Sequence, residues 1–290
     1  MKYAYYPGCS LHSTARDYDL STTAVCEELG IELVEIPDWN CCGATSAHAL
    51  DKEISIALPL RNLAIAESMG LDVVAPCAAC FNRMKSAHNA VMQDAELLSR
   101  MTARIGKPYS GKVRILPLLA VIDELGADVI QPHVKRPLSN LKVAPYYGCL
   151  LIRPPETVQF DDPEDPQSLD RLVAALGADT VKWPFKNECC GAGLSISKPE
   201  MVVKLTHDIL SMAKRCGANS MVTACPLCQA NLDLRQADVE KIYGEKLGLP
   251  TFYFTQLMGL AFDIPSSHLG LDKMMVSPAA LLAEAGVRGV

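Results

Sequence analysis

Residues 32–43 read ELVEIPDWNCCG, and residues 180–191 read TVKWPFKNECCG. Each stretch opens with β-branched and large apolar residues, which predict a short strand, and a proline then ends the strand. Two adjacent cysteines and a glycine follow in both places. The strands are expected at Glu32–Ile36 and Thr180–Trp183. The same local pattern therefore occurs once in each half of the chain.

Five cysteines in each half share nearly the same spacing. The pattern is C-x31-CC-x34-C-x2-C in the first half and C-x39-CC-x34-C-x2-C in the second. Such self-similarity indicates an internal duplication. The longer first spacing of the second half is attributed to the acidic, proline-broken stretch Asp161–Pro166, which predicts an exposed loop. The repeated cysteines are Cys9, Cys41, Cys42, Cys77 and Cys80, and Cys149, Cys189, Cys190, Cys225 and Cys228.

Strand patterns and helix patterns alternate along both halves, which predicts a parallel sheet in each. The fold expected is α/β, with two tandem repeated domains over residues 1–141 and 142–290, each a small parallel sheet flanked by helices, related by pseudo-twofold symmetry. Besides the two strands named above, strands are expected at 3–6, 72–75, 142–147 and 220–223. Helices are expected at 15–29, 48–69, 79–95, 169–176, 199–216 and 227–243.

Every cysteine group follows a predicted strand and precedes a predicted helix. Ligands of open parallel sheets bind beyond the carboxyl ends of the strands, so the five cysteines of each half are expected to converge there. The N-terminus of a helix also carries partial positive charge, which stabilises thiolates and lowers cysteine pKa values. This position therefore favours metal ligation on both geometric and chemical grounds.

Five thiolates exceed what a simple centre needs. A structural zinc ion takes four ligands, and a cubane [4Fe-4S] cluster also takes four cysteines. Two neighbouring cysteines do not easily ligate one metal ion, so the adjacent pairs indicate different irons of a polynuclear centre. Zinc bound by four of the five cysteines remains an alternative, and so do thioredoxin-like dithiols at the two C-x2-C pairs.

Composition narrows the class of protein. The chain has 290 residues, a formal net charge of −6 and no basic run, which argues against nucleic acid as a partner. It shows neither an apolar leader segment nor a stretch long enough to span a membrane, so a cytoplasmic location is expected. In a reducing cytosol, 12 cysteines indicate metal or redox chemistry rather than a disulfide framework.

With its Gly-Cys, Cys-Cys-Gly and Cys-x-x-Cys elements in tandem, the chain resembles the cysteine-rich CCG domains in the B subunits of heterodisulfide reductases and their relatives. The resemblance covers essentially the whole chain. It implies two noncubane [4Fe-4S] clusters, each held by five cysteines, with a substrate disulfide cleaved between them. It also implies two partners, a small ferredoxin-like iron-sulfur subunit and a flavin subunit. One cluster would be held by Cys9, Cys41, Cys42, Cys77 and Cys80, and the other by Cys149, Cys189, Cys190, Cys225 and Cys228.

The first hypothesis is therefore a catalytic iron-sulfur subunit of a larger oxidoreductase complex that reduces or forms a disulfide. No catalytic residue is assigned beyond the cluster ligands. Electrons must come from a partner, because no G-x-G-x-x-G fingerprint opens a βαβ unit in this chain. Two other functions stay open. One is a non-catalytic electron-relay subunit of a succinate dehydrogenase or hydroxy-acid oxidase type complex, and the other is a zinc-stabilised scaffold.

Several reactive side chains fall outside the repeated pattern. Cys26 and Cys216 have no counterpart in the other half and lie on predicted helices, so both are expected to be buried core residues. His12 and His48 follow cysteine groups closely and are candidates for hydrogen-bond or proton donors near the clusters. His207 lies on a helix after the second adjacent pair and is a weaker candidate for the same role.

Overall fold

The computed structural model describes residues 1–287 and contains two parallel sheets of four strands each. The two sheets have equivalent strand orders, β2-β1-β3-β4 and β6-β5-β7-β8, as a duplicated sequence requires. This confirms the predicted α/β fold of two tandem repeats. The first sheet holds β1 (Lys2–Tyr5), β2 (Glu32–Glu35), β3 (Val73–Ala75) and β4 (Ile115–Pro117), and the second holds β5 (Lys142–Tyr146), β6 (Asp179–Thr180), β7 (Ser220–Thr223) and β8 (Thr251–Tyr253).

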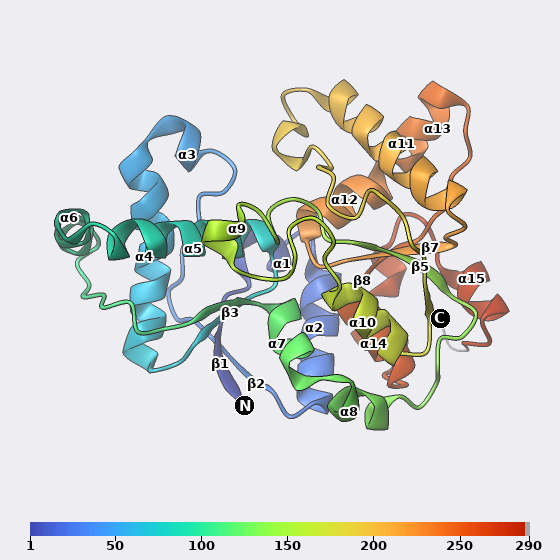
Figure 1. Cartoon of the computed structure of the whole chain (residues 1–290), viewed down its shortest axis with the longest axis horizontal. Coiled ribbons are helices and arrows are strands. Elements are labelled where there is room, and N and C mark those ends of the chain that lie inside the picture. Colours follow the sequence, from blue (N-terminus) through green and yellow to red (C-terminus); the bar gives the residue numbers. More distant parts are fainter. Residues whose placement is uncertain (288–290) are drawn as a thin grey trace.

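Helices connect the strands and flank both sheets (Figure 1). Each helix among residues 1–287 is too short or too polar to traverse a lipid bilayer. Those before β5 are α1 (Gly8–Leu11), α2 (Arg16–Glu28), α3 (Ala47–Leu50), α4 (Lys52–Met69), α5 (Ala78–Met92), α6 (Ala95–Ile105), α7 (Leu118–Leu125), α8 (Ala127–Ile130) and the short η1 (Gln131–His133). Those after it are α9 (Pro155–Val158), α10 (Ser168–Ala175), η2 (Ala192–Leu194), α11 (Pro199–Arg215), α12 (Pro226–Leu234), α13 (Gln236–Tyr243), α14 (Phe254–Ala261), η3 (Ser266–His268), η4 (Leu271–Lys273) and α15 (Ala279–Glu284).

Two of the predicted helices are broken in the structure. The helix expected at 48–69 is divided into α3 and α4 by Asp51, whose backbone is extended and whose side chain accepts a hydrogen bond from the N–H of Ile54. An aspartate in this position caps a new helix, which is why α4 starts there. The helix expected at 227–243 is divided into α12 and α13 at Arg235.

The central strands β3 and β7 are buried along their whole length. Their sequences, Val-Val-Ala and Ser-Met-Val-Thr, do not alternate between apolar and charged residues, which is typical of parallel strands covered by helices on both faces. Each central strand ends two residues before a C-x2-C pair. The most deeply buried part of each sheet therefore determines where these cysteines lie.

The two halves share one continuous apolar core. Helix α14, near the end of the chain, packs against α2, near its beginning, so the two lie side by side at the centre of the molecule (Figure 1). The rings of Tyr18 and Tyr253 stack there, with centroids 4.1 Å apart and planes 2° from parallel. The Ser21 and Thr255 hydroxyls hydrogen-bond at 2.7 Å in the same interface. The halves are thus held together by both ring stacking and a buried polar contact.

Tyr253→Leu is expected to lower the free energy of unfolding by about 2 kcal/mol, because it removes a stacked ring contact and leaves part of a buried volume unfilled. Tyr253→Phe keeps the ring and loses only a long hydrogen bond to Gln229, at 3.4 Å, so its effect should stay below about 1 kcal/mol. Denaturant unfolding of both variants, followed by circular dichroism, measures the difference. Equal destabilisation by the two substitutions would contradict this account.

Candidate metal centre

The cysteines of the first half lie at one end of the first sheet. Cys9 is in α1, which begins shortly after β1 ends, and Cys77 directly precedes α5, which follows β3. Cys80 lies in the first turn of α5. The adjacent pair Cys41 and Cys42 lies farther along, in the loop between β2 and α3. The predicted position at strand ends is confirmed for Cys9 and Cys77, whereas the adjacent pair is reached through a longer loop than expected.

The second half repeats this arrangement. Cys149 follows β5, Cys225 directly precedes α12, and Cys228 lies in the first turn of α12. Cys189 and Cys190 lie in the loop between β6 and η2, nine residues beyond the strand, because β6 ends at Thr180 rather than at Trp183 as expected. In both halves the second cysteine of the adjacent pair is buried and the first is exposed.

Sulfur atoms approach one another within each half. The Sγ atoms of Cys42 and Cys80 are 3.2 Å apart, and those of the matching Cys190 and Cys228 are 3.6 Å apart. Cys149 and Cys189 are 3.9 Å apart. The structure therefore brings together cysteines that are 38 to 40 residues apart in the sequence.

Glycines make room for these sulfurs. Gly8 and Gly148 precede Cys9 and Cys149, and both have a positive φ, of 63° and 66°. A β-carbon on Gly148 would lie 2.9 Å from the sulfur of Cys228, and one on Gly8 would lie 3.3 Å from that of Cys80. Each glycine thus lets the loop that carries the first cysteine pass close to the last cysteine of the same motif.

The two motifs also meet each other. Cys225 is the main cause that raises the pKa of Cys77, and Cys228 followed by Cys77 lowers the pKa of Cys225, so these matching cysteines of the two halves influence each other's charge. Asn82 on α5 reinforces the junction, because its side-chain amide donates to the carbonyl oxygens of Leu150 and Arg153, just beyond Cys149. The two sets of cysteines are therefore neighbours across the interface of the repeats.

Hydrogen bonds among the thiols shift their pKa values in opposite directions. The thiols of Cys41 and Cys80 lower the pKa of Cys42 to about 3, and the bond to Cys42 is the main reason that the pKa of Cys80 is raised well above its usual value. In the second half, Cys149 and then the N–H of Gly191 lower the pKa of Cys189 to about 6, against the opposing effect of burial. Thiolate is the form of cysteine that binds metal, so the lowered pKa values of Cys42 and Cys189 would favour metal binding there.

The donor set consists of sulfur, which fits thiophilic metals and iron-sulfur clusters. Within the part of the chain that the structure describes, no three cysteine, histidine, aspartate or glutamate side chains form a ready site for a single metal ion. The sulfurs approach one another in pairs.

The three candidate histidines have different surroundings. His12 directly follows α1, 3.3 Å from a carboxylate oxygen of Glu35 and edge-on to the ring of Trp39. His48 is exposed on α3. His207 hydrogen-bonds Glu245 at 3.0 Å and stacks on Tyr243, a setting with no cysteine ligand among its contacts. A donor role near the clusters stays a prediction for His12 and His48.

The two unmatched cysteines have different environments. Cys26 is buried in the core, as predicted, and burial raises its pKa to about 12. The prediction for Cys216 is wrong, because this residue is exposed. It directly follows α11, where the chain turns toward Gly217, so its side chain leaves the apolar face of the helix.

Three residues that support the cysteine loops were not selected from the sequence as part of the site. Tyr6 and Tyr146 donate hydrogen bonds to the carbonyl oxygens of Asn40 and Glu188, each directly before an adjacent cysteine pair. The repetition of this tyrosine at matching positions in both halves could have identified the two residues from the sequence. Lys186, three residues before Cys189, carried no such signal because its match in the first half is Asp38.

A cavity of about 760 Å³ is lined mostly by residues of the second half. Its lining includes Thr45 and Ser46, which follow the first adjacent pair, and Ala192, which follows the second. Leu227, between the last two cysteines, and Arg235 line it as well. Its volume is in the range of small-molecule sites, and residues beside both motifs contribute to its walls.

Comparisons with known proteins agree with this arrangement. The sequence profile of the CCG cysteine-rich domain matches residues 3–85 and 143–233. The chain is 35% identical to the 8-methylmenaquinol:fumarate reductase membrane anchor subunit of Wolinella succinogenes, over 97% of this chain and 99% of the relative. It is 28% identical to the B subunit of the ferredoxin/F(420)H(2)-dependent CoB-CoM heterodisulfide reductase of Methanosarcina acetivorans, over 98% of this chain and 96% of the relative.

A solved structure shares the fold. It is a hypothetical protein from Helicobacter pylori, which matches with a TM-score of 0.78 at 13% sequence identity. The match covers 95% of this chain and 52% of the other, so this chain spans about half the length of that protein. The likeness extends across both repeats and concerns the fold alone.

Proposed function

Since the chain belongs to the cysteine-rich CCG domain family, we propose that it is the iron-sulfur subunit of a heterodisulfide-reductase-like complex and that it reduces or forms a disulfide. The subunit would hold two [4Fe-4S] clusters of the noncubane type, one in each repeat over residues 1–141 and 142–290. The ligands of the first would be Cys9, Cys41, Cys42, Cys77 and Cys80, and those of the second Cys149, Cys189, Cys190, Cys225 and Cys228.

The closeness of the two motifs carries this proposal: Cys77 and Cys225 shift each other's pKa, and Asn82 of the first half donates to the carbonyl oxygens of two residues just beyond Cys149. A disulfide takes up two electrons on becoming two thiols, whereas iron-sulfur clusters transfer electrons singly and, when bound, supply iron as a Lewis acid toward sulfur. Two neighbouring motifs would let each half serve one sulfur of the substrate. The buried thiols of Cys77 and Cys225 keep water away from this junction.

The cavity beside the two adjacent cysteine pairs would admit a disulfide or thiol substrate. Thr45 and Ser46 on one side and Ala192 on the other bring residues next to both adjacent pairs to its surface. A small ferredoxin-like iron-sulfur subunit and a flavin subunit would deliver the electrons, and the complex would work in the cytoplasm. Relatives named as subunits of multi-subunit reductases support a role within a complex.

A second candidate is an electron-relay subunit of a fumarate reductase or succinate dehydrogenase type complex, in which the same clusters pass electrons onward without acting on a disulfide. The observation that favours it is the 35% identity to a fumarate reductase membrane anchor subunit over nearly the whole of both chains. The two candidates share the cluster ligands and differ in whether a substrate thiol reaches them.

Metal analysis and spectroscopy of the anaerobically purified chain test the proposal. We expect a brown protein with about eight irons, four for each cluster. Addition of thiol compounds under oxidising conditions should then produce a new paramagnetic signal if a substrate sulfur binds at a cluster. Iron without a response to any thiol would favour the relay function instead. A colourless protein that contains zinc would overturn both candidates.

A further inference from the structure

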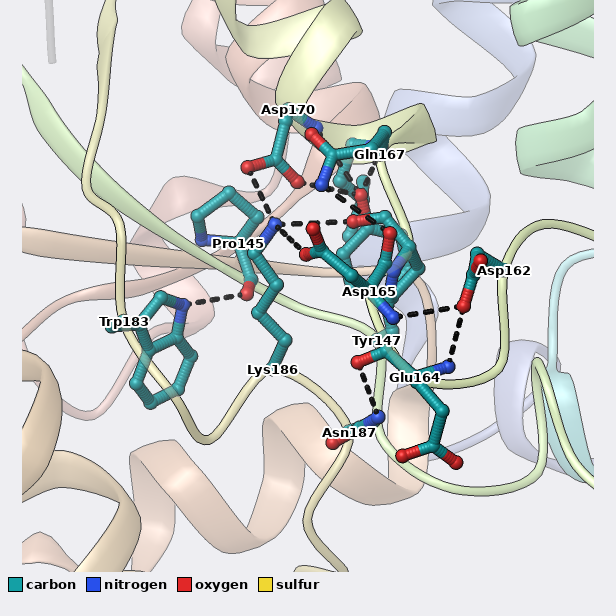
Figure 2. A network of polar contacts seen from close by, with 12 residues as sticks. Pro145, Tyr147, Asp162, Glu164, Asp165, Gln167, Asp170, Trp183, Lys186 and Asn187 are labelled. Atoms are coloured by element: carbon teal, nitrogen blue, oxygen red, sulfur yellow. Dashed lines mark hydrogen bonds and ion pairs between the residues drawn. The ribbon is translucent and has the colours of Figure 1, made fainter.

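A nearly buried lysine lies close in sequence to the second adjacent pair. Only 7% of Lys186 is exposed, and its ammonium group has three partners: a carboxylate oxygen of Asp170 at 2.9 Å, the carbonyl oxygen of Pro166 at 3.1 Å and a carboxylate oxygen of Asp165 at 3.3 Å. Figure 2 shows this ammonium between the two carboxylates. Since an ammonium group has three N–H donors, all of them are satisfied.

Tyr147 extends this contact to the start of α10. Its hydroxyl donates to the second carboxylate oxygen of Asp170, at 2.7 Å, and accepts the backbone N–H of Leu169 at 2.8 Å (Figure 2). Lys186, Asp170 and Tyr147 therefore form one connected set, which we call the lysine network. Asp165 and Pro166 come from the acidic stretch, so this stretch is not simply the exposed loop that the sequence predicted.

The backbone links the lysine network directly to the cysteines. The carbonyl oxygen of Lys186 accepts hydrogen bonds from the N–H groups of Tyr147, at 2.8 Å, and Gly148, at 3.2 Å. Gly148 precedes Cys149, and Lys186 lies three residues before Cys189. The segments that carry these two cysteines are thus joined to each other at Lys186, and its side chain holds the joined segments against α10 and the loop before it.

The first half has no equivalent set. Pro7 stands where Tyr147 stands in the second half, and it offers neither a hydroxyl nor a backbone N–H. Asp38 stands in place of Lys186, with its side chain largely exposed and paired with Arg61. The eight-residue difference in spacing, which includes the acidic stretch, is likewise confined to the second half. A change in the lysine network should therefore affect only one of the two motifs.

We propose that the lysine network positions Cys149 and Cys189 and so stabilises whatever centre the second motif binds, independently of the first. This inference rests on the proposed function for the identity of that centre. Groups that orient metal ligands without touching the metal typically change metal affinity 10- to 100-fold when they are replaced. Lys186 is thus a positioning residue for one repeat, and the two centres should respond separately to its loss.

Lys186→Met tests the proposal, because methionine fills most of the same volume without the ammonium group. In the iron-free full chain, we expect Cys149 to react with a thiol-alkylating reagent about 10-fold faster than in the wild type, while Cys9 and Cys41 react at unchanged rates. Mass spectrometry of the digested protein measures each cysteine separately. The buried Cys26 reports global unfolding, and its alkylation should not increase.

Two further variants sharpen the test. Lys204→Met removes a lysine that is 65% exposed and paired with Asp208 on α11, and should leave all rates unchanged. Lys186→Arg retains a cation and should restore a large part of the protection of Cys149. In the iron-loaded chain, Lys186→Met should make the second motif lose iron to a chelator about 10-fold faster than in the wild type, with the first motif unaffected.

The outcomes separate the two proposals. Unchanged alkylation of Cys149 in Lys186→Met, or an equal increase at Cys9, Cys26 and Cys41, overturns the positioning role. The positioning role is also overturned if both motifs bind iron and Lys186→Met loses it from both equally fast. A wild-type chain that never binds iron overturns the proposed function instead, and the alkylation experiment still decides the role of Lys186.

Discussion

Cys42→Ser should abolish disulfide turnover and leave the chain with about half of its iron. Cys42 is buried, and its sulfur lies 3.2 Å from that of Cys80, so a replacement there affects the interior of the first motif. Serine keeps nearly the same shape, but its hydroxyl is a poor ligand for iron because thiophilic metals prefer thiolate sulfur. If one cluster contains four irons, about four of eight should remain.

Iron analysis together with turnover by the complete complex measures this effect. Cys190→Ser is the matched change in the second motif and should give the same two losses. Cys216→Ser replaces an exposed cysteine outside both motifs and should keep full iron and full activity. Full turnover by Cys42→Ser with unchanged iron would show that the first motif does not hold a cluster, whereas half the iron with full turnover would assign catalysis to the second motif alone.

The repeated part of the fold could be predicted because the duplication presents the sequence pattern of each strand and helix twice. Strand β7 has the predicted bounds, Ser220–Thr223. Strands β2, β3 and β5 differ from the predictions by one residue at one end, and β1 differs by one residue at both ends. The strands β4 and β8 were not predicted. They have three residues each and lie more than 20 residues from any cysteine in the sequence, so no neighbouring motif marks them.

Contacts between the halves could not be derived from the sequence. The spacing of the cysteines predicts which of them belong to one motif, but it says nothing about how the halves meet, either where α2 packs on α14 or at Cys77 and Cys225. The stacking of Tyr18 on Tyr253 is of the same kind, because 234 residues separate Ser21 from Thr255 in that interface. Such pairings follow from tertiary packing and have no local pattern.

The burial of Lys186 could not be predicted from the sequence for a different reason. A single lysine is usually exposed, and nothing beside Lys186 in the sequence identifies Asp165 and Asp170 as its partners. The eight-residue difference in spacing predicts an exposed loop and no more than that. The folding of this loop over Lys186 is visible only in the structure, since a charge is buried when partners from several segments meet it.

Gly148→Ala should release most of the iron bound by the second motif. An added β-carbon would lie 2.9 Å from the sulfur of Cys228, closer than real contacts allow, and the residue has a φ of 66°, which disfavours alanine. Relief of the clash requires that the sulfur or the loop before Cys149 move, and either movement changes the position of a ligand. Iron content should fall toward about half, as expected for the loss of one of two clusters.

Gly244→Ala separates the clash from the backbone strain. Gly244 ends α13 with a φ of 67°, nearly the same as that of Gly148, but an added β-carbon there would have no neighbour within 4 Å. Both variants should therefore lose about 1–2 kcal/mol of stability through the left-handed conformation, and only Gly148→Ala should also lose iron. Equal iron in the two variants would mean that the space beside Cys228 is not needed for binding. Loss of iron from both would trace the effect to general destabilisation, because an added β-carbon on Gly244 touches nothing in the second motif.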